Sequence, residues 1–168
     1  MNRNDLRFIK TEKIIKSTYL SLKKKNPSPI KVSELCRAAM INKSTFYSHY
    51  ETIEYLHHQI CVETIDSLIH NLYDVDSITN ELEAFVIAII KILRSNASLL
   101  NMLFDGDRNK IVSYVKKSIL SLFSTHDELK EKEKEVIFAI GGAANLLITN
   151  QEKETVNIAI KLIHKTIN

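Results

Sequence analysis

Glycine and proline are scarce in this chain of 168 residues, which contains only 3 Gly and 2 Pro. These are the residues that most often interrupt helices, and the long stretches between them are rich in Leu, Ile, Lys, Glu and Ala. No internal repeat or low-complexity segment is apparent. The composition therefore predicts an all-α fold, and the length is sufficient to bury a hydrophobic core.

Long hydrophobic runs are also lacking. The longest uninterrupted apolar run, Ala84 to Ile90, is much shorter than a membrane-spanning helix requires. The first residues, MNRNDLRFIK, are charged and are not followed by the apolar segment of a secretory signal. We therefore expect a soluble, cytoplasmic protein with no membrane association.

Cysteine is too rare for a disulfide framework, since only Cys36 and Cys61 occur. His57 and Cys61 are four residues apart and could share a metal on a helix, but two ligands do not make a zinc site. The sequence has no Gly-rich phosphate loop, no metal-ligand cluster and no Ser/His/Asp arrangement above chance. It therefore predicts no catalytic residues, metal or cofactor.

Charge is distributed unevenly along the chain. Residues 1–50 contain 11 Lys and Arg against 3 Asp and Glu, a net charge of +8, whereas residues 51–168 carry a net charge of −5. This asymmetry predicts a polyanion-binding domain at 1–50 and an acidic domain at 51–168. A basic helix that is merely solvated is the alternative interpretation.

The segment from Lys31 to Leu56 has the pattern of two short amphipathic helices joined by a turn and followed by a third. Apolar residues recur in the first helix with the i, i+3, i+4, i+7 spacing of one helix face: Val32, Leu35, Cys36 and Ala39. Cys36 is therefore interpreted as a small buried residue.

The second helix is predicted from Lys43 to His49, with Asn42 as an N-cap whose side chain accepts a backbone N–H. Phe46 and Tyr50 are expected to be buried, because they share one face at i and i+4. The opposite face is polar, aromatic and cationic: Lys43, Ser44, Tyr47 and Ser48. A short helix with such a face suits the DNA major groove.

The remaining pattern predicts about nine helices in all. A first helix from about Asp5 to Lys24, ended by a left-handed Asn26, would complete a three-helix head. A linker helix at 52–73, capped by Thr52, would connect the head to the body. Five body helices are expected. The first four are Asn80 to Leu93, 96–104, a helix with apolar residues on one face over 111–122, and Thr125 to Thr149, and the last is near 155–167.

Between Ile14 and Leu56 the sequence resembles TetR-type (TetR/AcrR) helix-turn-helix transcriptional regulators. Residues 45–50, Thr-Phe-Tyr-Ser-His-Tyr, fit the recognition-helix string of Thr, apolar, Tyr, any, His, aromatic. Ile14-Ile15 and Lys31-Val32 match the patterns of the two preceding helices. The resemblance implies a three-helix head, a long connecting helix and a divergent helical body.

The resemblance also implies roles for individual residues. Lys43, Ser44, Thr45 and Ser48 would face base edges, with Asn42 beside them. Tyr47 and His49 would bind phosphates, although both could instead pack as amphipathic rings. Lys31 or Ser33 would touch the DNA backbone.

Three positions depart from the family pattern. Met40 stands at the turn glycine, which implies a turn without positive φ or a mildly strained one. Asn26 replaces a glycine that ends the first helix. Ile53 replaces a lysine that often contacts phosphate, so one backbone contact is missing.

A homodimer is predicted from the last two helices, through residues 131–148 and 155–167. The segment from Val136 to Ile148 is apolar nearly all round and contains small residues that allow close helix approach. The alternative is a helix fully buried within one subunit. Two-fold symmetry would match a pseudo-palindromic operator.

A small-molecule effector pocket in the body is implied by the family, and the body supplies candidate lining residues. These are Phe85, Ile89, Met102, Phe104, Tyr114, Phe138 and Asn145. The sequence thus predicts a ligand-responsive regulator, most simply a repressor. The alternative is a protein-interaction adaptor or coactivator on the same fold, whose body binds another protein.

Overall fold

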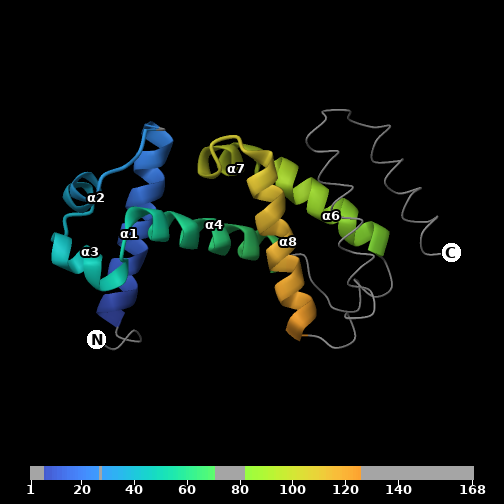
Figure 1. Cartoon of the computed structure of the whole chain (residues 1–168), viewed down its shortest axis with the longest axis horizontal. Helices are drawn as coiled ribbons and strands as arrows, with labels where there is room; N and C mark the ends of the chain where they lie inside the picture. Colours follow the sequence, from blue (N-terminus) through green and yellow to red (C-terminus); the bar gives the residue numbers. More distant parts are fainter. Residues whose placement is uncertain (1–5, 27, 71–81, 126–168) are drawn as a thin grey trace. The chain divides into compact units, whose positions relative to one another are not determined.

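The computed structural model describes residues 6–26, 28–70 and 82–125, without the side chains of 82–86 and 122–125. This part of the chain is entirely helical and contains no strand, which confirms the all-α prediction there (Figure 1). None of its helices is long and apolar enough to cross a bilayer. The predicted helices at 125–149 and 155–167 lie outside the described residues, apart from Thr125, which is the last residue of a helix rather than the first of the next.

Seven helices occur in these ranges. In chain order they are α1 (Leu6–Lys25), α2 (Val32–Ala38), α3 (Lys43–His49), α4 (Ile53–His70), α6 (Leu82–Ser95), α7 (Ala97–Leu103) and α8 (Arg108–Thr125).

The chain divides into two compact units, Met1–Cys61 and Val62–Asn168. The division falls inside α4, whereas the charge pattern placed it ahead of this helix, after residue 50. The first turns of α4 therefore belong with α1, α2 and α3.

The first unit is built around large apolar side chains contributed by each of its helices. Ile15 of α1, Leu35 of α2, Phe46 of α3 and Leu56 of α4 are all fully buried. In each short helix the buried positions recur every three or four residues, so one face packs inward and the other is left to solvent. This arrangement fixes which side of α3 remains available to a partner.

The ends of these helices differ in part from the predictions. Asn26 lacks the left-handed conformation, and its side-chain oxygen instead accepts the N–H of Ser28 at 3.0 Å. Asn42 occupies the N-cap position of α3, but its side chain caps no backbone N–H. The Thr52 cap is confirmed, because Thr52 Oγ1 accepts the N–H of Tyr55 at 3.0 Å.

The second unit contains α6, α7 and α8 in its described part. Asn96 and Phe104 flank α7, as predicted, and a turn with left-handed Asp105 and Gly106 leads into α8. Ser118 of α8 is buried and donates a hydrogen bond of 2.5 Å to Asp66 Oδ1 of α4. This charge-assisted bond fixes the second half of α4 against α8.

Candidate nucleic-acid interface

The turn between α2 and α3 is closed by two backbone hydrogen bonds. The Ile41 N–H donates to the Cys36 carbonyl at 3.0 Å, and the Met40 N–H donates to the Arg37 carbonyl at 3.3 Å. This pair of bonds defines a Schellman motif, in which the residue at Met40 adopts a left-handed conformation. Met40 has φ 53°, so the strained form of the two predicted turns is the one found.

The two faces of α3 have the predicted burial. Phe46 is fully buried and Tyr50 is 2% exposed, so both belong to the core. On the opposite face Tyr47 is 56% exposed, and Lys43, Ser44 and Ser48 are exposed as well. The helix therefore presents a row of polar and cationic groups that its own chain does not cover.

The other predicted DNA-contacting residues lie around this face. Lys31, Ser33 and Asn42 are exposed, while Thr45 is half-buried. Ser48 Oγ donates to the Thr45 carbonyl at 2.7 Å. This bond uses the Ser48 proton and leaves its oxygen lone pairs as acceptors, which suits the amino group of adenine or cytosine.

His49 lies between α3 and the first turn of α1. Its ring stacks on Phe8 with centroids 3.8 Å apart and an interplanar angle of 23°. Its Nδ1 is buried and has no hydrogen-bond partner among the residues that the structure describes. Burial lowers the pKa of His49 by disfavouring the charged ring, and Glu12 partly opposes this effect. His49 is therefore a packing residue, with Nε2 as the nitrogen left for a partner.

Glu12 joins α1 to the end of α3. Burial raises the pKa of Glu12, but its hydrogen bond and charge interaction with Lys16 outweigh that effect, so the pKa lies below its ordinary value. Glu12 Oε1 is 2.7 Å from Lys16 Nζ and accepts the Tyr50 hydroxyl at 3.3 Å. These contacts hold the C-terminal end of α3 on α1.

A second polar contact holds α4 on α1. The hydroxyl of Tyr19 and Nδ1 of His57 are 3.0 Å apart, and Nε2 of His57 is 3.5 Å from Cys61 Sγ. Within the described residues no group of three or more His, Cys, Asp or Glu could hold a metal ion. The contact between Tyr19 and His57 fixes the first half of α4 on α1.

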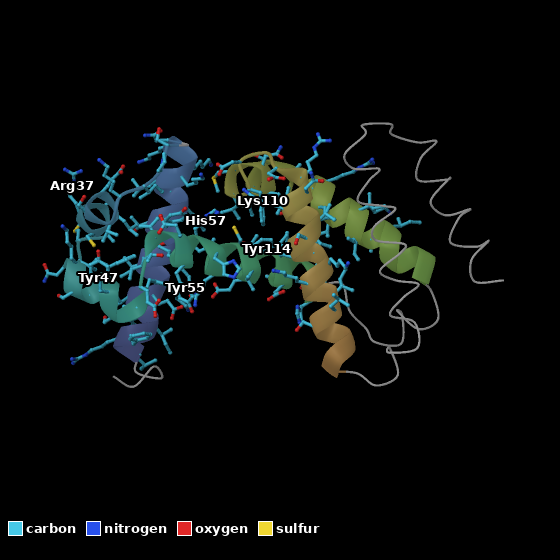
Figure 2. The ribbon with its side chains drawn as sticks, viewed as in Figure 1. Arg37, Tyr47, Tyr55, His57, Lys110 and Tyr114 are labelled. Carbon is cyan, nitrogen blue, oxygen red and sulfur yellow. The ribbon has the colours of Figure 1, made fainter. Side chains whose placement is uncertain are left out.

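Sequence reasoning missed Arg37 beside α3, and it named Met40 at the turn without foreseeing its exposure. Arg37 is exposed near the end of α2, and Met40 is 92% exposed at the tip of the turn. The spacing of Ser33 and Arg37 at i and i+4 could have placed Arg37 on the outer face of α2. Figure 2 shows Arg37 and Tyr47 on the side of α2 and α3 that lies away from α1.

The residues predicted to line an effector pocket are only partly described. Ile89 and Phe104 are buried, and Met102 and Tyr114 are half-buried. Phe104 and Tyr114 meet edge to face with centroids 5.1 Å apart. The Phe85 side chain, Phe138, Asn145 and the predicted dimer segments 131–148 and 155–167 lie outside the described residues.

No family model, no curated protein and no solved structure matches this chain. The resemblance to TetR-type regulators therefore stays a prediction that depends on the residues between Ile14 and Leu56.

Proposed function

We propose that this protein is a DNA-binding transcriptional regulator of the TetR type, with α2, the turn at Met40 and α3 as its helix-turn-helix. The observation that carries the proposal is the exposed face of α3. A seven-residue helix held by Phe46 on one side presents Lys43, Ser44, Tyr47 and Ser48 on the other. Such a helix fits the width of a major groove and supplies groups that recognise bases and phosphates.

The charge of the first 50 residues supports the same proposal, because a net charge of +8 attracts a polyanion. The residues of the face divide by chemistry. Lys43 can donate to O6 and N7 of guanine, Ser44 can bond to either kind of base edge, and Ser48 can accept from the amino group of adenine or cytosine. The Tyr47 hydroxyl can reach a phosphate oxygen and fix the position of the helix on the duplex.

The rest of the proposed function concerns the second unit. The protein would act as a homodimer through 131–148 and 155–167, on a pseudo-palindromic site whose halves are about 34–36 Å apart or a multiple of that distance. A small molecule bound in the body would change the position of α4 and so lower DNA affinity, which makes the protein a ligand-responsive repressor.

The test uses the DNA fragment that precedes the coding sequence of the protein. We expect the affinity to fall steeply with salt, because bound counterions are released when Lys and Arg contact phosphates. Tyr47→Phe should weaken binding by about tenfold or more on every sequence, as expected for the loss of one hydrogen bond to a charged group. Lys43→Ala should weaken binding and also relax the preference for sequence.

Two matched variants serve as controls. Tyr55 is an exposed tyrosine of α4, and Lys116 is an exposed lysine of α8. Tyr55→Phe and Lys116→Ala should leave DNA affinity unchanged, because neither residue is among those predicted to contact DNA. Binding that is insensitive to salt, or equal losses in the test and control variants, would contradict the proposal.

A further inference from the structure

Met40 stands at a backbone position that an apolar residue ordinarily avoids. The two hydrogen bonds that close the turn require a left-handed residue there, and Met40 has φ 53°. Glycine is usual at this position of the motif, because a Cβ atom in the left-handed conformation crowds the backbone. The other left-handed residue besides glycine in the described chain is Asp105, whose short polar side chain tolerates this conformation better.

Contacts within the protein do not offset this strain. The Met40 side chain is 92% exposed, the highest exposed fraction among the large apolar residues that the structure describes. An unbranched thioether is flexible and polarisable, and methionine is common on surfaces that adapt to a partner. The position and exposure of Met40 are therefore those of a residue that contacts another molecule.

The neighbours of Met40 define what that molecule must offer. Arg37 precedes it near the end of α2, Lys43 follows it at the start of α3, and both side chains are exposed. A partner that is anionic around an apolar group would complement these three side chains. Double-stranded DNA satisfies both requirements, because phosphates flank the major groove and the thymine methyl group is the apolar group that the groove exposes.

We propose that Met40 packs against a thymine methyl group in the major groove and so sets a preference for thymine beside the bases that α3 contacts. The inference rests on the proposed function and extends it to a specificity-determining residue outside α3. Burial of one methyl group stabilises by about 0.8 kcal/mol, which corresponds to about a fourfold difference in affinity. The contact therefore contributes mainly to sequence preference.

The experiment compares the wild-type protein with Met40→Gly and Met40→Leu. The probe is a duplex that the wild-type protein enriches from a random-sequence pool. A series of modified duplexes is then prepared, in each of which one thymine is replaced by deoxyuridine, which lacks the methyl group. Wild type should lose about fourfold in affinity at one thymine of each half-site. Met40→Gly should bind the unmodified duplex about fourfold more weakly and be insensitive to that replacement.

The two variants separate the contact from the shape of the turn. Met40→Gly relieves the strain, so its Tm should rise by a few degrees while its DNA affinity falls. Met40→Leu keeps the strain and the apolar reach, and should retain both the affinity and the sensitivity to deoxyuridine.

Three results would overturn the inference. The first is a selected site at which no thymine is sensitive to replacement by deoxyuridine. The second is a Met40→Gly variant that binds the unmodified duplex with wild-type affinity. The third is a Met40→Gly variant whose affinity is lower than that of wild type by the same factor on every duplex, modified or not. If Met40→Gly binds DNA as tightly as wild type, the partner of Met40 would instead be a protein. In each of these cases the proposed function stands if Tyr47→Phe and Lys43→Ala still weaken binding. It fails separately if the wild-type protein enriches no duplex.

Discussion

Replacement of His49 by phenylalanine should make the first unit more stable. The new ring can keep the stack on Phe8, whose centroid is 3.8 Å from that of His49, and it removes a buried Nδ1 that has no partner among the described residues. A buried polar atom without a hydrogen bond costs about 1–3 kcal/mol. Because the His49 ring is only half-buried, the lower end applies, and we expect His49→Phe to gain about 1 kcal/mol.

The gain should depend on pH in a defined direction. Burial lowers the pKa of His49 in the folded protein, whereas in the unfolded chain it is near its ordinary value of 6.5. Between these two values the unfolded chain binds more protons, so the free energy of unfolding increases with pH. The stability that the neutral His49 ring contributes to the free energy of unfolding is fully present above pH 6.5. It is lost as the pH falls toward the pKa of the folded protein, and below that pKa it changes no further. His49→Phe should lack this acid-dependent loss.

Urea denaturation followed by circular dichroism, at several values between about pH 5 and pH 8, measures both effects. His49→Ala is the control, because it removes the titration but also the stack. It should lose the acid dependence and be less stable than His49→Phe by at least about 1 kcal/mol, the contribution typical of an aromatic pair. Equal stability and equal pH dependence in wild type and His49→Phe would refute the reasoning.

Three other substitutions test the packing of the two units. Phe46→Ala should lower the free energy of unfolding by about 3–5 kcal/mol, because it empties a fully buried site. Calorimetry should then show loss of the unfolding transition of the first unit, and Phe46→Leu is the milder control. Tyr19→Phe should lower the urea midpoint by an amount equivalent to about 1 kcal/mol, since His57 loses a partner at 3.0 Å, and an unchanged midpoint would contradict this. Ser118→Ala should cost about 1–3 kcal/mol in thermal denaturation, because the Asp66 carboxylate loses a donor, whereas Ser113→Ala at an exposed site of α8 should be neutral.

The helices of the first unit were predictable because their patterns are local. The bounds of α3 agree with the prediction at both ends, since Phe46 and Tyr50 mark one face and polar residues fill the other. Burial of Leu35 and Cys36 follows from the same spacing in α2. A period of three to four residues requires no knowledge of the partner helix, so the sequence alone determines it.

The cap at Asn42 and the turn at Met40 were less predictable, because each position has two local conformations of similar free energy. Asn42 has the right side chain for a cap, but at an exposed position the same side chain can be hydrated at little cost, and here it makes no cap. Met40 could follow either of two turn conformations, and the backbone bonds of the Schellman motif select the left-handed one. In both cases competing states differ by about 1 kcal/mol, which a sequence pattern does not resolve.

Pairs that form between distant segments leave no trace in such patterns. Phe8 and His49 are far apart in the sequence, and the spacing within α1 or α3 does not indicate that their rings stack. The stack changes the interpretation of His49. The family resemblance implied a phosphate ligand, with packing as the alternative, and the geometry shows the packing. With Nδ1 buried, only Nε2 is left to reach DNA.

Each half of α4 is fixed by a polar contact within its own unit. Its first half is fixed by His57, whose Nδ1 meets Tyr19, and its second half by Asp66, whose carboxylate accepts a bond from Ser118. The two fixing points are nine residues apart, about 13.5 Å along an α-helix. Neither glycine nor proline, residues that often kink a helix, occurs between Ile53 and His70. Within the first unit, the contact of His57 with Tyr19 holds α4 on α1, which also supports the end of α3 through the Glu12–Tyr50 hydrogen bond and the Phe8–His49 stack.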